Sequence, residues 1–126
     1  MRPLREALQG DPPCELLLEW VDGCREIDRE IYLELLESGE PKSVDDIAEA
    51  IDRDRSTAYR AVRRLHEAEY LEREQITYDN GGYCYTYEPK DPNDVAAVLH
   101  ERIDQYHRDL DALVEEFRRQ YGKRES

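Results

Sequence analysis

The sequence predicts a mainly α-helical protein with a small β-hairpin and a long C-terminal helix. Apolar residues recur at helical spacing through most of residues 27–65. The period then changes to that of strands on both sides of an Asn-Gly step. From residue 91 a longer helical repeat begins. We therefore expect a flexible N-terminal tail at 1–13, a winged helix-turn-helix domain at 14–90 and a coiled-coil dimerisation helix at 91–122.

The first predicted helices have the order and spacing of a helix-turn-helix. A long amphipathic helix starts near Ile27 and ends at Gly39, where glycine is a common stop signal. Ser43, followed three residues later by a carboxylate, caps a helix of about two turns. A break at 51–54 then leads into a second helix, whose N-cap is Asp54. Two helices joined by so short a break are typical of helix-turn-helix motifs.

The helix after the break reverses the charge of its surroundings. The chain has a formal net charge of −13, yet five arginines lie within positions 53–64. Because Ala58, Val62 and Leu65 share an apolar inner face, polar groups remain on the outer face and at the N-terminal end. Such groups reach phosphates and base edges in a major groove, although a solvated face of balanced charges is the alternative. The expected DNA-binding residues are Arg53, Arg55, Ser56, Thr57, Tyr59, Arg60, Arg63 and Arg64.

A β-hairpin is predicted directly after this helix. Residues 70–78 and 82–87 are rich in aromatic and β-branched side chains, and they flank Asn80-Gly81. An Asn-Gly step supplies the positive φ values that a tight hairpin needs. A two-stranded hairpin in this position forms the wing of a winged helix. Its tyrosines are ordinary strand formers, so we do not include them among the expected DNA contacts.

These segments resemble the TrmB-like winged-helix transcriptional regulators of archaea. The resemblance rests on residues 31–39 (IYLELLESG), 44–48 (VDDIA) and 56–65 (STAYRAVRRL), and it covers about half of the chain. At Glu69 this sequence departs from the family, which usually carries a glycine there. The resemblance implies a DNA-binding repressor or activator. Because 126 residues leave no room for the large sugar-binding domain of longer family members, we expect no sugar effector.

The acidity of the chain bears on its partner. It has 31 acidic and 18 basic residues, and only three of the basic residues are lysines. DNA should repel such a protein at long range. The composition resembles that of proteins from halophilic archaea, where molar salt shortens the Debye length to roughly 3 Å and leaves only close Arg–phosphate contacts. The alternative is an interaction module that binds another protein and recruits transcription machinery.

The C-terminal segment predicts a homodimer. Asp91-Pro92 begins a helix that ends near Gly122, and its apolar residues recur in steps of three and four. A second copy is the simplest cover for this seam, although the seam packing back on its own winged helix is the alternative. A two-fold dimer reads a pseudo-palindromic double-stranded operator with half-sites about 34 Å apart, or a multiple of that. The expected dimerisation residues are Leu99, Ile103, Tyr106, Leu110, Leu113 and Phe117.

One of the three cysteines is a candidate redox sensor. Cys24 lies at the start of the first long helix, where the helix dipole lowers the pKa of a thiol, although nearby acids oppose this. TrmB-like regulators of halophilic archaea include thiol-based oxidative-stress regulators, so the resemblance implies that oxidation of Cys24 alters DNA binding. The alternative is that Cys24 is a small buried apolar residue.

Other function classes find little support in the sequence. There is no glycine-rich phosphate loop and no nucleophile elbow, so we expect neither an enzyme nor a cofactor. His100, Asp104 and His107 share one helix face, but charged coiled-coil faces have the same pattern, and we expect no metal site. No apolar run approaches the roughly 18 residues of a membrane span, and the N-terminus lacks a signal peptide. We therefore expect a cytoplasmic protein.

Overall fold

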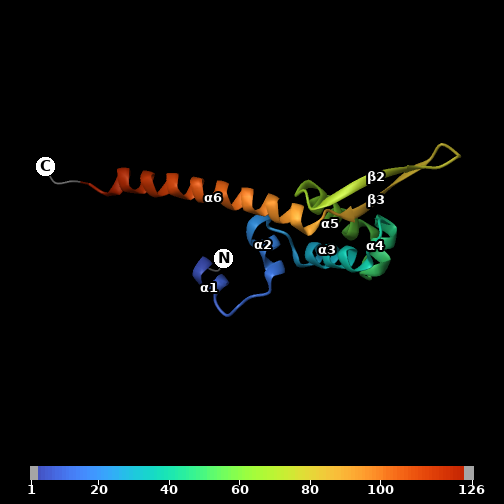
Figure 1. The fold of residues 1–126 in the computed structure, drawn as a ribbon, viewed down its shortest axis with the longest axis horizontal. Coiled ribbons are helices and arrows are strands. Elements are labelled where there is room, and N and C mark those ends of the chain that lie inside the picture. The colour runs from blue at the N-terminus through green and yellow to red at the C-terminus, as the bar shows by residue number, and fades with distance from the viewer. Residues whose placement is uncertain (1–2, 124–126) are drawn as a thin grey trace.

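The computed structural model describes residues 3–123 and places a winged-helix body at the base of one long helix (Figure 1). The predicted architecture, mainly helical with a small sheet and a long C-terminal helix, is confirmed. The wing and the long helix point away from the body in opposite directions (Figure 1). In chain order the elements are α1 (Leu4–Leu8), a 3-10 turn (Cys14–Leu16), α2 (Leu17–Asp22), α3 (Glu26–Ser38), β1 (Lys42–Ser43), α4 (Val44–Ala50), α5 (Arg55–Glu67), β2 (Leu71–Thr77), β3 (Tyr83–Pro89) and α6 (Pro92–Tyr121).

Local capping explains where the helices of the helix-turn-helix begin and end. The Ser43 hydroxyl accepts the backbone amide of Asp46 at 3.2 Å, which satisfies one free donor of α4. The Asp54 carboxylate accepts the amide of Thr57 at 3.1 Å in the same way at the start of α5. Gly39 ends α3 with a φ of 72°, a conformation that glycine adopts without strain. Both predicted N-caps are therefore confirmed.

The wing belongs to a three-stranded antiparallel sheet with the order β1-β3-β2. Strands β2 and β3 pair along their whole length, and Gly81 turns the chain between them with a φ of 88°. The hairpin is confirmed, but β1 was not predicted, because two residues are too short to show a period of two. Lys42 pairs with Tyr87 and Ser43 pairs with Thr86, so β1 joins the base of the wing to the start of α4.

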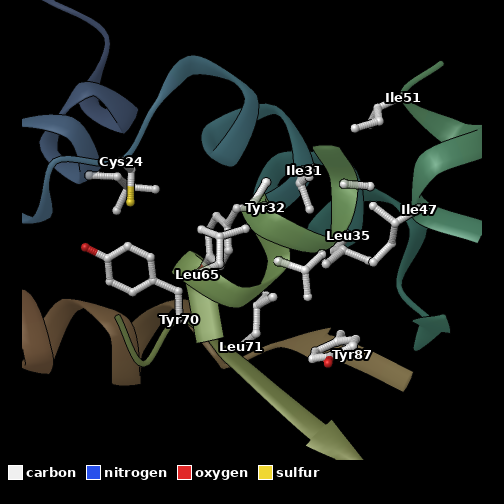
Figure 2. Packing of buried hydrophobic residues seen from close by; sticks show 14 of the residues in the cluster. Cys24, Ile31, Tyr32, Leu35, Ile47, Ile51, Leu65, Tyr70, Leu71 and Tyr87 are labelled. Carbon is white, nitrogen blue, oxygen red and sulfur yellow. The ribbon is translucent and has the colours of Figure 1, made fainter. Parts of the chain in front are cut away.

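The core lies where α3, α4, α5 and the base of the wing meet. Its largest fully buried side chains come from all four parts, and Figure 2 shows them in contact around α5. Burial of each large apolar side chain contributes about 1.5–3 kcal/mol, so this cluster holds α5 against the rest of the body. The fully buried apolar residues include Ile31, Leu35, Ile47, Leu65, Tyr70 and Leu71.

Two further features concern the ends of the chain. Residues 4–8 lie in the segment expected to be a flexible tail, but they form α1 and bury Ala7. The flexibility expected of the tail at 1–13 stays a prediction, but residues 4–8 have a helical conformation. Within residues 3–123, no helix is both long enough and apolar enough to cross a membrane.

Candidate nucleic-acid interface

Helix α5 presents one face to the core and a polar face to solvent. Ala58, Ala61, Val62 and Leu65 are fully buried, as the helical period predicts. Thr57 is half-buried and its hydroxyl donates to Asp54 at 2.7 Å, so this side chain helps to cap the helix. The predicted contact residues that face solvent are Arg53, Arg55, Ser56, Tyr59, Arg60 and Arg63.

The arginines on this face are weakly held. Arg55 pairs with Asp45 at 2.8 Å, and Arg63 pairs with Glu67 at 3.4 Å, and all four side chains are exposed. Exposed ion pairs contribute only about 0–1 kcal/mol, so these guanidinium groups can exchange a carboxylate for a phosphate at little cost. No carboxylate of the described chain lies within ion-pair distance of Arg53 or Arg60.

Arg64 turns in the opposite direction. Its Nε and Nη2 atoms donate to the two Asp28 oxygens at 2.9 and 2.8 Å, and Asp28 is fully buried. The same carboxylate accepts the Arg25 amide at 3.0 Å. The hydrogen bond with Asp28 raises the pKa of Arg64. The guanidinium group of Arg64 therefore links α5 to α3, and the DNA contact at Arg64 stays a prediction.

A signal for this link was present in the sequence. Asp28 precedes Ile31 by three residues and Tyr32 by four, so helical spacing places its carboxylate on the buried face of α3. A buried carboxylate requires a cationic partner. The run of arginines in α5 offered several partners, and the spacing alone does not say which arginine turns inward.

A groove runs between α5 and the wing. Its volume is about 300 Å³, and tyrosine side chains from both elements line it together with Arg55. The rings of Tyr83 and Tyr85 lie 5.7 Å apart, and the Arg73 guanidinium lies 4.2 Å from the Tyr85 ring centre. Phenolic hydroxyls donate hydrogen bonds without carrying charge. Sequence reasoning did not include Tyr83 or Tyr85 in the interface, because strand tyrosines are common wherever strands pack.

Cys24 lies between α2 and α3, at the edge of the core (Figure 2). Its side chain is only 5% exposed. Burial, reinforced by the charges of Asp28 and Asp22, raises the pKa of the Cys24 thiol to about 11. The expectation that the helix dipole lowers this pKa is therefore wrong, because burial and two carboxylates outweigh the dipole.

The thiol nevertheless borders an open cleft. The cleft has a volume of about 430 Å³ and reaches from the end of α2 to α6. Its lining includes Cys24 and two arginines, Arg64 and Arg102. A small reagent can therefore approach Cys24 from one side. The other two cysteines differ in exposure, since Cys14 is exposed and Cys84 is half-buried.

Helix α6 leaves most of its apolar seam uncovered. Val95 and Leu99 are buried against the body, and the Tyr106 hydroxyl donates to the Val21 carbonyl at 2.7 Å. The part of the seam that packs back on the winged helix therefore ends within the first half of α6. The exposed apolar residues of the seam are Ile103, Tyr106, Leu110, Leu113 and Phe117, with Val114 and Tyr121 beside them.

The predicted histidine face carries no cluster. His107 lies 3.7 Å from Asp111, one turn further along α6, and both side chains are exposed. Across residues 3–123, no group of three His, Cys, Asp or Glu side chains is arranged to hold a metal ion.

The sequence of the helix-turn-helix and wing matches a known protein family. Residues 18–93 match the family described as "Sugar-specific transcriptional regulator TrmB". The chain belongs to the TrmB family. The matched span runs from α2 through the wing to the start of α6, so it includes the whole helix-turn-helix. The family is one of transcriptional regulators rather than enzymes.

The chain is also similar in sequence to other archaeal proteins and in fold to solved structures. Two uncharacterized proteins of Methanocaldococcus jannaschii, MJ1503 and MJ1082, are each 34% identical to the chain. The first matches 79% of this chain and 75% of its own length, and the second matches 82% and 85%. A possible transcriptional regulator from Methanosarcina mazei Go1 has a TM-score of 0.73 at 24% identity, covering 82% of this chain and 88% of its own. The ST1889 protein of Sulfolobus tokodaii has a TM-score of 0.60 at 12% identity, covering 75% and 91%.

The link between Arg64 and Asp28 generates an asymmetric prediction. Arg64→Met leaves the fully buried Asp28 charge without its partner, so we expect a loss of about 3–5 kcal/mol in the free energy of unfolding. Asp28→Asn leaves Arg64, whose side chain is 30% exposed and can turn to water, so we expect a smaller loss, about 1–3 kcal/mol. Urea denaturation measures both, with Arg63→Met as the matched exposed control. A larger loss for Asp28→Asn than for Arg64→Met would contradict this account.

Proposed function

We propose that this TrmB-family protein is a sequence-specific DNA-binding transcriptional regulator that acts as a homodimer. The observation that carries the proposal is the solvent face of α5. Among residues 3–123, no carboxylate lies within ion-pair distance of Arg53 or Arg60, and Arg55 and Arg63 form weak exposed pairs, on a chain of net charge −13. A local cationic face on an acidic molecule is where a polyanion docks. The family assignment supports the same partner.

The residues of this face divide into two roles. Side chains in the first turns of α5, namely Ser56, Tyr59 and Arg60, reach base edges when the helix enters a major groove. Arg53, Arg55 and Arg63 lie around that set and contact phosphates. Thr57 caps the helix through Asp54 and presents its methyl group. Arg64 is assigned to neither role, since Asp28 occupies its guanidinium group.

The tyrosine groove extends this surface toward the wing. Tyr59 and Tyr83 are 44% and 58% exposed, and their hydroxyls are available to phosphate oxygens. Hydroxyl donors suit an acidic protein that works in concentrated salt, because they depend less on ionic attraction than arginines do. We therefore propose that binding is adapted to high salt, as the composition of halophilic proteins suggests. No sugar effector is part of this proposal.

The homodimer part of the proposal rests on α6. A helix of 30 residues is about 45 Å long, and the exposed seam occupies the half that projects from the body. Two such seams cover each other as a coiled coil. The resulting two-fold axis presents two α5 helices to one face of DNA, which fits a pseudo-palindromic operator.

A protein-interaction module is the competing function, and the α5 arginines separate the two. For a DNA reader we expect Arg60→Ala to cost about 1–3 kcal/mol and to relax sequence preference at one position. We expect Arg63→Ala to weaken binding to all DNA sequences equally. We also expect it to reduce the slope of the logarithm of the binding constant against the logarithm of the salt concentration by about one. Fluorescence anisotropy on operators selected from random DNA measures both.

Arg118→Ala is the control for these two variants, because Arg118 is an exposed, carboxylate-paired arginine far along α6. We expect it to bind like the wild type. If Arg60→Ala also binds like the wild type, the arginine face is a solvated surface and the interaction module becomes the better account.

The seam of α6 predicts the oligomeric state. Leu110→Glu combined with Phe117→Glu places charges in the centre of the proposed interface, so we expect a monomer at micromolar concentration where the wild type is a dimer. Analytical ultracentrifugation gives the mass. Leu33→Glu is the matched control, because Leu33 is also an exposed apolar residue but lies on α3. A monomeric wild type would refute the dimer.

We further propose redox control through Cys24, for which the open cleft is the supporting observation. Hypochlorite transfers its oxygen to the sulfur, forming a sulfenic acid and releasing chloride. The added oxygen lies beside the Asp28–Arg64 link, so it loosens the contact that holds α5. The raised pKa of the thiol makes this reaction slower than at an exposed cysteine.

We expect hypochlorite to change the operator affinity of the wild type and of Cys14→Ser, but not that of Cys24→Ser. Anisotropy titrations before and after oxidation measure this, with mass spectrometry to locate the modified sulfur. A Cys24→Ser variant that responds as strongly as the wild type would exclude Cys24 as the sensor.

A further inference from the structure

The junction between the body and α6 is built around one side chain. Before this junction Val95 and Leu99 are buried, and beyond it nearly all described side chains of α6 are exposed. Arg102 lies one turn before the last contact of α6 with the body, which the Tyr106 hydroxyl makes with the Val21 carbonyl, and the Arg102 side chain is only 21% exposed. Burying an arginine to this extent requires partners for its five N–H groups.

Arg102 finds three acceptors on two parts of the body, the end of α2 and the turn that follows α5. Its Nη1 atom donates to Asp22 at the end of α2 at 2.7 Å and to the Ala68 carbonyl at 2.8 Å. Its Nη2 atom donates to the Glu69 carboxylate at 2.7 Å. Ala68 is the C-cap of α5, where a cation is favoured by the free carbonyls and the helix dipole. One guanidinium group therefore connects α6 directly to the end of α5.

The partners of Arg102 are themselves held in place. The Tyr70 hydroxyl donates to Asp22, and the Tyr70 ring is fully buried in the core. Asp22 is thus fixed from two sides, with its side chain only 13% exposed. The half of the junction formed by Arg102 and Asp22 is therefore largely buried, whereas the Glu69 side chain is 58% exposed.

Glu69 adds a second observation, which concerns the backbone. Its φ is +71°, a left-handed conformation that costs energy for any residue with a Cβ and none for glycine. The turn alone would favour glycine at this position. The glutamate is explained by its side chain, since the carboxylate completes the set of acceptors around Arg102.

We propose that Arg102, with Glu69, is a positioning residue that sets the angle between α6 and α5 and thereby the half-site spacing that the dimer accepts on DNA. The inference rests on the proposed function, because spacing has a meaning only for a dimer with two reading helices. It goes beyond that function, because neither residue touches DNA or lies in the exposed seam.

The length of α6 beyond Arg102 makes the angle between α6 and α5 important. Nineteen residues separate Arg102 from Tyr121, which corresponds to about 28 Å of helix. A tilt of about 10° at Arg102 moves the far end by about 5 Å, more than the roughly 3.4 Å rise of one base pair. If α6 is fixed in the dimer, the same tilt displaces α5 relative to the other half-site.

Two variants release the junction while keeping the helix and the core. Glu69→Gly removes one acceptor and also removes the left-handed strain, so we expect its melting temperature to equal or exceed that of the wild type. Arg102→Lys keeps the charge but loses the planar fork that reaches several acceptors at once. Arg108→Lys is the matched control, since Arg108 is exposed and donates to Gln105 on the same helix.

The experiment measures affinity for a series of operators whose two half-sites are separated by spacers that differ by one base pair, together with a single half-site. For the wild type we expect at least about a tenfold loss of affinity one base pair away from the best spacing. For Glu69→Gly and Arg102→Lys we expect this loss to shrink below about threefold, with single half-site affinity within about twofold of the wild type. Arg108→Lys keeps the wild-type profile.

A second readout does not depend on DNA. Backbone ¹⁵N relaxation of the full chain reports whether α6 and α5 tumble together, and we expect independent nanosecond motion of α6 only in the two junction variants. Wild-type spacing profiles and unchanged relaxation in these variants would overturn the positioning role. A wild type that fails to prefer two half-sites over one would instead reject the dimeric reader itself, whatever the relaxation data show.

Discussion

The pair between buried Asp28 and Arg64 is the interaction on which the geometry of the solvent face of α5 depends. Adjacent residues on a helix point about 100° apart, so the inward turn of Arg64 determines which way Arg63 and Arg60 face. Apolar packing of Val62 and Leu65 favours the same rotation but tolerates small shifts. A bidentate pair with fixed hydrogen-bond directions does not, so the ion pair selects one orientation of α5.

The carboxylates that pair with arginines fall into two groups, buried and exposed. Carboxylates that pair with arginine in the interior, such as Asp22 and Asp28, fix the relation of one helix to another. Carboxylates on the outer face, such as Asp45 and Glu67, hold arginines only loosely. An excess of acid therefore does not cancel the cationic face of α5. The same side-chain type therefore links helices in the interior and remains exposed on the outer face of α5.

The elements of the fold that could be predicted from the sequence are those determined by residues close to each other in the chain. The caps at Ser43 and Asp54, the stop at Gly39 and the start at Asp91 were predictable, because each depends on residues within one turn. The apolar stripe of α6 was also predictable from spacing. The assignment of Leu99 to the dimer seam was not supported, because Leu99 is buried in the core of its own body. Strand β1 was missed because its two residues are defined only by their partners on β3.

The candidate site was predicted less completely, for the same reason. Of the two adjacent arginines at the end of the basic run, only the fold distinguishes Arg64, whose partner is 36 residues away. The thiol of Cys24 was assessed from its position at the start of a helix, whereas burial, followed by the charges of Asp28 and of Asp22 from another helix, raises its pKa. The tyrosines of the groove come from two elements and could not be grouped before the wing was placed against α5.

Ser43 belongs to the sheet and also caps a helix, so it couples the wing to the start of α4. Its backbone belongs to β1 and pairs with Thr86 in the wing, while its hydroxyl accepts the amide of Asp46 in the first turn of α4. The base of the wing also packs in the core through Leu71 and Tyr87, so Ser43 gives the wing a second, shorter connection to the start of α4. The exchange rate of the Asp46 amide proton with solvent therefore reports on bending of the wing.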